Sequence, residues 1–175
     1  IPTLAESTGS LWLPSQSSTV AGEVDGVFSL ILWISLAFFV GIVGALVWFV
    51  VRYRRRDGVP AARQIHHSTS LEIAWSVIPF LLLIVIFAAG FTTFMGMAAE
   101  PDNCYEIKVV GKKWAWSFEY PNGYIDDALH IPVDRPIKLV MSSDDVIHSV
   151  FIPAFRVKRD VIPGRYTSLV FQATE

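Results

Sequence analysis

The chain of 175 residues has little cysteine and little charge. Its single cysteine, Cys104, excludes an intrachain disulfide framework and a cysteine-pair site for zinc or an iron–sulfur cluster. Charged residues make up 17% of the chain, whereas a typical soluble domain carries about 25%. The formal net charge of −2 provides no global basic field, so we expect no nucleic-acid partner. Together with 53% hydrophobic residues, this composition excludes an ordinary soluble globule and a disordered tail.

The apolar residues are concentrated in two runs without a charge, residues 27–51 and 73–99. A membrane-spanning helix needs about 20 mostly apolar residues, so each run is long enough to span a bilayer. The loop between them is rich in arginine, which keeps short loops in the cytoplasm and places both chain ends on the outer side. The sequence therefore predicts five segments: an exported N-terminal segment 1–26, a transmembrane helix 27–51, a cytoplasmic loop and helix cap 52–72, a second transmembrane helix 73–99, and an exported domain 100–175.

The second apolar run begins with two residues that allow two interpretations. Thr69 and Glu72 have the spacing of a capping box, in which the two side chains satisfy backbone donors at a helix start. An acid at a membrane boundary is also a common part of a proton path. The residues alone leave both interpretations of Glu72 open. Pro79 lies further into the run and predicts a bend in the helix.

The exported domain has the pattern of an all-β fold. Short alternating segments are separated by turn signals, which favours an antiparallel sandwich or a Greek-key barrel. The predicted strands are residues 105–110, 114–120, 136–141 and 165–173. The predicted turns lie at Gly111 and residues 121–123, 134–136 and 162–164.

Few residues of this domain offer chemistry. His148 follows two acids and opens an apolar segment; it is either a hydrogen-bonded structural residue or a metal ligand. Trp114 and Trp116 share one face if they lie in a strand, either as core aromatics or as an exposed docking site. The acids Glu119, Asp126, Asp127, Asp144 and Asp145 form two clusters in sequence. If these clusters meet in space, they form an anionic patch that steers a basic partner.

Several segments together resemble subunit II of heme–copper cytochrome c oxidases. They are EVDGVFSLILW, LEIAWSVIP, VVGKKWAWSFEYPNG and MSSDDVIHSVFIPAFRVKRDVIPGRYTSLVFQA. The resemblance implies a two-helix transmembrane hairpin and an all-β cupredoxin-like Greek-key domain, truncated before its last strands. It also implies roles for single residues: His148 as the first ligand of the binuclear copper centre CuA, Trp114 as the electron entry, Glu72 near the entrance of the K proton pathway, and Glu119, Asp127, Asp144 and Asp145 as docking acids.

The implied function is that of the electron-entry subunit of a respiratory terminal oxidase in a bacterial plasma membrane. Electrons from cytochrome c, which is soluble, membrane-anchored or fused, would pass through CuA to heme in subunit I. There oxygen would be reduced to water with proton pumping. The implied partners are membrane lipid and oxidase subunits I and III, and subunit I would hold heme and CuB. A copper-free quinol oxidase subunit and a structural membrane-anchored β-sandwich module are the alternatives.

The sequence departs from this family in two places. The other CuA ligands follow a C-x-E-x-C-x-x-x-H-x-x-M pattern, which is not reached before Glu175. Cys104 precedes His148 and does not replace those thiolates, so we expect the remaining ligands beyond Glu175; a degenerate, copper-free subunit is the competing interpretation. Ala115 also stands between the two tryptophans where the family has a tyrosine or a similar aromatic residue.

Overall fold

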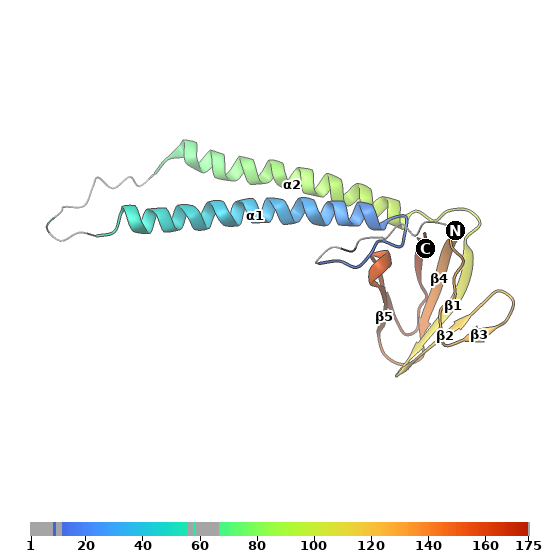
Figure 1. The fold of residues 1–175 in the computed structure, drawn as a ribbon. Coiled ribbons are helices and arrows are strands. Elements are labelled where there is room, and N and C mark those ends of the chain that lie inside the picture. Colours follow the sequence, from blue (N-terminus) through green and yellow to red (C-terminus); the bar gives the residue numbers. More distant parts are fainter. Residues whose placement is uncertain (1–8, 10–11, 56–57, 59–66, 175) are drawn as a thin grey trace. The chain divides into compact units, whose positions relative to one another are not determined.

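The computed structural model describes residues 9, 12–55, 58 and 67–174 (Figure 1). Parts of the predicted N-terminal segment and of the predicted cytoplasmic loop, with Arg56 and Arg63, lie outside these residues. The chain divides into two units, Ile1–Asp25 with Thr92–Glu175, and Gly26–Phe91. The first unit holds the β-sheet domain, and the second holds most of the two long helices.

The two helices are α1, Ala21–Arg52, and α2, Thr69–Ala98. Both are long and apolar enough to cross a membrane, and the most apolar stretch of each lies open to the surroundings in the described part of the chain. Exposed apolar side chains around a whole helix are typical of contact with lipid. The two predicted spans are therefore helices, and α1 continues beyond 27–51 at both ends. Helix α2 runs on through Pro79.

The β-sheet domain contains seven strands among the described residues. A five-stranded sheet has the order β3-β2-β1-β4-β7, and β5 and β6 form a second, two-stranded sheet. The strands are β1 Tyr105–Lys112, β2 Ala115–Glu119, β3 Ile125–Asp126, β4 Pro136–Ser143, β5 His148–Ile152, β6 Val157–Val161 and β7 Thr167–Gln172, with the short 3-10 helix η1, Pro153–Phe155, between β5 and β6.

The predicted fold class, two apolar helices followed by a β-sheet domain, is confirmed, with one change in topology. Strands β1 and β4 pair in parallel, whereas the other strand pairs are antiparallel, so the larger sheet is mixed. The chain makes this parallel pair because a long connection through β2 and β3 returns it to the free edge of β1. Hairpin connections alone would have kept the sheet antiparallel.

The core lies on one face of the larger sheet and includes side chains from β6. Strand β4 alternates between buried and half-buried residues along its whole length, as the period of two in a strand requires. Leu139 at its centre is fully buried. Val157 and Val161 of β6 join the same cluster. The core therefore ties the β5–β6 sheet to the larger sheet.

The turn between β1 and β2 differs from the predicted one. Strand β1 continues through Gly111 to Lys112, which pairs with Ala115, so the turn consists of Lys113 and Trp114. Gly111 is therefore a strand residue, and the predicted turn there is wrong. Trp114 has a φ of 67°, in the left-handed region, which ends the strand alternation.

The residues before α1 are fastened to the β-sheet domain. The backbone N–H of Ser17 donates to the carbonyl of Ala154 in η1, and the N–H of Thr174 donates to the carbonyl of Ser17. Arg156, directly after η1, donates from Nε to Oδ1 of Asp25 at 2.7 Å and from Nη2 to Oδ2 at 2.9 Å. This stretch therefore lies between η1 and the end of β7, and the first turns of α1 belong to the same unit.

Candidate functional site

The candidate site lies where the β1–β2 turn meets the loop between β4 and β5. His148 is the first residue of β5, and the preceding loop carries Asp144 and Asp145. The backbone N–H of Asp144 donates to the carbonyl of Gly111 at 3.0 Å, which fixes the loop to the end of β1. Two segments more than 30 residues apart in sequence are thereby held together.

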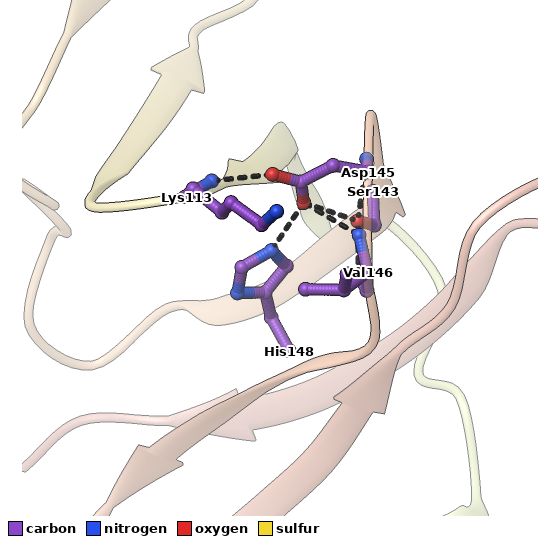
Figure 2. Close-up of polar contacts among 5 residues, drawn as sticks. All are labelled: Lys113, Ser143, Asp145, Val146 and His148. Carbon is purple, nitrogen blue, oxygen red and sulfur yellow. Dashed lines mark hydrogen bonds and ion pairs between the residues drawn. The ribbon is translucent and has the colours of Figure 1, made fainter.

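The carboxylate of Asp145 connects the two segments through both of its oxygens (Figure 2). Oδ2 accepts the backbone N–H of Lys113 at 2.7 Å. Oδ1 accepts the backbone N–H of Val146 at 2.6 Å and lies 2.7 Å from Nε2 of His148. These contacts lower the pKa of Asp145, and the hydrogen bond to His148 is the largest cause. Asp145 is therefore an organising residue of the site.

The hydrogen bond also defines the tautomer of His148. An ionised carboxylate only accepts hydrogen bonds, so Nε2 of His148 must carry the proton and donate it to Asp145. In a neutral imidazole this leaves the lone pair on Nδ1. Histidines that bind a metal through one nitrogen commonly donate the other N–H to a carboxylate. The His148 side chain is 18% exposed, and Trp116 contacts its ring edge-on, with 5.6 Å between ring centroids.

The two tryptophans do not share a face, contrary to the strand-based prediction. Trp114 is fully exposed in the turn, whereas Trp116 lies in β2 and packs partly against the core. The left-handed backbone of Trp114 is the reason, because it breaks the alternation before β2 begins. The exposed Trp114 therefore directly follows Lys113, whose backbone N–H donates to Asp145.

The structure separates the predicted docking acids. Asp144 and Asp145 lie at the turn that carries Trp114, although the oxygens of Asp145 are occupied by internal partners. Glu119 lies at the opposite end of β2, about 13 Å along a strand of this length. It forms an ion pair with Lys108 at 3.2 Å. Asp127 is exposed just after β3, whose Asp126 pairs with Phe118 at that same end of β2. The acids therefore line both ends of the strand.

Glu72, the predicted proton-path residue, lies in the first turn of α2. The backbone N–H of Glu72 donates to the carbonyl of Ser68, so Ser68 rather than Thr69 stands at the cap position. Oε1 of Glu72 lies 2.8 Å from Nδ1 of His67, and Oγ1 of Thr69 lies 3.0 Å from Nε2 of the same ring. The structure thus gives both side chains of the predicted capping box a contact with His67.

The residues present do not by themselves form a two-copper site. Across the described ranges, no group of three or more His, Cys, Asp and Glu side chains is placed to hold a metal ion. His148 offers one imidazole nitrogen. Cys104 precedes β1 by one residue, roughly 20 Å along that strand from Gly111. Its thiol therefore does not reach the imidazole.

Sequence reasoning missed two parts of the site, Gly111 and the backbone of Lys113. Nothing in the residue types predicted that the β1–β2 turn contacts the β4–β5 loop. The spacing of Asp145 and His148 in the segment DVIH was the one available signal, because a carboxylate three residues before a histidine can reach its ring.

Comparisons with known proteins match the chain to one family in both of its parts. Residues 6–93 match the family model "Cytochrome C oxidase subunit II, transmembrane domain", and residues 123–175 match "Cytochrome C oxidase subunit II, periplasmic domain". The first match includes α1 and most of α2, which makes the chain a membrane protein.

Individual relatives agree with the family models. The chain is similar to cytochrome c oxidase subunit 2 of Synechocystis sp., at 31% identity over 93% of the chain and 64% of that relative. It is also similar to the same subunit of Thermostichus vulcanus, at 31% identity over 93% of the chain and 66% of that relative. It thus spans just under two thirds of the length of these relatives.

A solved structure shows a further likeness. The periplasmic domain of subunit II of cytochrome oxidase of Bradyrhizobium japonicum is 34% identical over 45% of the chain and 69% of that domain, with a TM-score of 0.40. The family models and the two full-length relatives determine the assignment: the chain belongs to the cytochrome c oxidase subunit II family.

Proposed function

We propose that the chain is the electron-entry subunit of a respiratory terminal oxidase and takes electrons from cytochrome c at the turn that carries Trp114. The observation that carries this proposal is the connection through Asp145. One oxygen of this carboxylate accepts the N–H of Lys113, next to Trp114, and the other accepts the N–H of His148. The carboxylate thereby joins the half-buried imidazole to the backbone of the residue directly before the fully exposed Trp114.

In this proposal His148 is one ligand of the family's binuclear copper centre, and the other ligands come from residues after Glu175. When bound, that centre supplies one-electron redox chemistry. The chain's own part is to hold the imidazole so that Nε2–H stays on Asp145 and Nδ1 keeps its lone pair. The heme and CuB of the implied subunit I lie outside this chain.

The docking partner would be recognised by charge around an apolar contact. Asp144 is exposed beside the Trp114 turn, and Asp127 and Glu119 form a second acidic group at the opposite end of β2. A fully exposed tryptophan within such a surface is typical of an interface hot spot. A basic cytochrome c fits this surface, with association that weakens as salt screens the charges.

Glu72 would contribute on the cytoplasmic side. Its side chain is 41% exposed and holds His67, so a carboxylate and an imidazole lie together at the start of α2. Such a pair can exchange protons with water and with a neighbouring subunit. We propose that this pair lies near the entrance of a proton pathway into subunit I, with the β-sheet domain on the outer side of a bacterial plasma membrane.

The test compares two exposed aromatics in the assembled oxidase. Trp114→Ala should slow oxygen consumption driven by reduced cytochrome c and leave consumption driven by a small-molecule reductant unchanged. Trp12→Ala is the matched control, because Trp12 is 72% exposed and lies two residues before Pro14, whose carbonyl accepts a hydrogen bond from Arg156 after η1, beyond the end of β5 opposite His148. Unchanged turnover with cytochrome c in the Trp114 variant would remove the turn from the electron path.

A further inference from the structure

The backbone conformation at Gly111 does not require a glycine. It lies inside β1 and pairs with Trp116 on one side and Ser143 on the other. The glycines with left-handed backbone are Gly58, Gly123 and Gly164 among the described residues, so Gly111 has a conformation open to any residue. A glycine inside a strand weakens it unless a neighbour needs the space.

The neighbours at Gly111 do need the space. A Cβ at this position would lie 3.0 Å from Cζ3 of Trp116 and 3.2 Å and 3.4 Å from Cδ2 and Cγ of His148. Carbon atoms pack best at about 3.5–4.0 Å, so the contacts with Cζ3 of Trp116 and Cδ2 of His148 would be too short. The missing side chain therefore leaves a place for the imidazole ring on the surface of β1.

The ring has little freedom to move aside. Nε2 of His148 is bound to Asp145, and Asp145 is held in turn by the N–H groups of Lys113 and Val146 (Figure 2). Trp116 contacts the ring edge-on. A methyl group at position 111 would meet both rings at once, so a shift of one would not relieve the other.

We propose that Gly111 and Trp116 are positioning residues that set the ring plane of His148. Gly111 provides the floor on which the imidazole lies, Trp116 closes one edge, and the hydrogen bond to Asp145 fixes the rotation about the remaining axis. The direction of Nδ1 then follows from the three contacts together. The consequence for electron transfer rests on the proposed function, in which His148 is a copper ligand.

The experiment introduces Gly111→Ala into the full-length subunit within the assembled oxidase. The first readout is the position of the His148 ring in a high-resolution structure, where we expect a displacement of about 0.3 Å or more, the amount needed to bring Cδ2 from 3.2 Å to a normal contact distance. The second is the electron paramagnetic resonance spectrum of the copper centre, which a loss of stability alone would not reshape. Lys112→Ala is the control, because Lys112 is the exposed neighbour of Gly111 in β1.

A second variant keeps the test decisive if Gly111→Ala does not assemble. Trp116→Phe removes the ring carbon that lies nearest to position 111 and introduces no clash. It should alter the spectrum by itself, and it should partly restore assembly and the spectrum when combined with Gly111→Ala. A ring that stays in place in Gly111→Ala, or an unaltered spectrum in Trp116→Phe, would overturn the proposal.

The outcomes also separate this inference from the proposed function. An unmodified oxidase without a copper spectrum, or without turnover on cytochrome c, would contradict the proposed function alone. The displacement of the His148 ring in Gly111→Ala would still be measurable in such an oxidase. A normal copper spectrum that Gly111→Ala and Trp116→Phe both leave unchanged would contradict the positioning role alone.

Discussion

Replacing Arg156 should cost more stability than replacing any exposed arginine of the β-sheet domain. Its side chain is 6% exposed, and its guanidinium donates to both oxygens of Asp25 and to the carbonyls of Pro153 and Pro14. Gln16 donates to the same carboxylate at 2.8 Å. One side chain thus joins η1, the segment before α1 and the first turns of α1.

The magnitude follows from what Arg156→Ala leaves behind. Breaking a buried ion pair by removing one partner costs roughly 3–5 kcal/mol, because the remaining charge loses its counterpart. Asp25 is 18% exposed and regains some water, so we expect about 3 kcal/mol, the lower end of that range. With a typical urea slope of about 1–3 kcal/mol per M, this lowers the urea midpoint by about 1–3 M.

The backbone of Arg156 provides an internal check. Its φ of 60° is left-handed, which costs a residue with a Cβ roughly 1 kcal/mol and costs glycine nothing. Arg156→Gly should therefore be less destabilising than Arg156→Ala by about that amount. This difference reports the backbone conformation alone, because both variants remove the same guanidinium.

The assay is urea unfolding of the detergent-solubilised full chain, followed by tryptophan fluorescence. Arg159→Ala is the control, because Arg159 is exposed in β6 and its loss should change stability by no more than about 0.5 kcal/mol. Asp25→Asn and the double variant complete a cycle that isolates the interaction between the two side chains. Equal midpoints for Arg156→Ala and Arg159→Ala would refute this reasoning.

Four further predictions concern the core, the turn, docking and pH. Leu139→Ala should lower the free energy of unfolding by about 2–5 kcal/mol, because Leu139 is fully buried in β4. Trp114→Gly should change stability by less than about 1 kcal/mol, because the ring is fully exposed and glycine accepts its φ of 67°. Neutralising Asp144 and Asp127 should raise the KM for cytochrome c and flatten its dependence on ionic strength in steady-state kinetics. The backbone N–H of Ala128 and then the hydroxyl of Tyr124 lower the pKa of Asp126 to about 2. A depressed carboxyl pKa stabilises the fold above the unfolded pKa of about 3.9, and that stabilisation is lost as the pH falls towards 2. Asp126→Asn should therefore flatten the pH dependence of unfolding between about pH 4 and pH 2, whereas an unchanged pH profile would exclude Asp126 as its source.

The elements that depend on local pattern were predictable. A charge-free run of more than 20 residues has no stable alternative to a spanning helix, because unpaired backbone groups are too costly in lipid. Strand β4 was predictable from its alternation, and the structure extends it by two residues, to Ser143. The roles predicted for Trp114, His148 and Glu72 came from the family resemblance, and they remain predictions.

The elements that depend on contacts between distant residues were not predictable. Glycine is common in turns, so Gly111 was predicted to lie in one. It lies in a strand instead, where its missing side chain leaves room for Trp116 and His148. The prediction that Trp114 shares a face with Trp116 was wrong because Trp114 itself has a left-handed backbone, which ends the strand alternation that the prediction assumed. The parallel pairing of β1 and β4 depends on where the chain returns after β3.

The sequence by itself determined the two helices, the β character of the remaining domain and the family, because hydropathy, alternation and motif are properties of neighbouring residues. The tertiary structure decided that Asp145 holds both Lys113 and His148 and that the imidazole lies on Gly111. The physical reason is that the site forms where the β1–β2 turn and the β4–β5 loop meet. The two segments are far apart in the sequence, and only the packing of the two sheets brings them together.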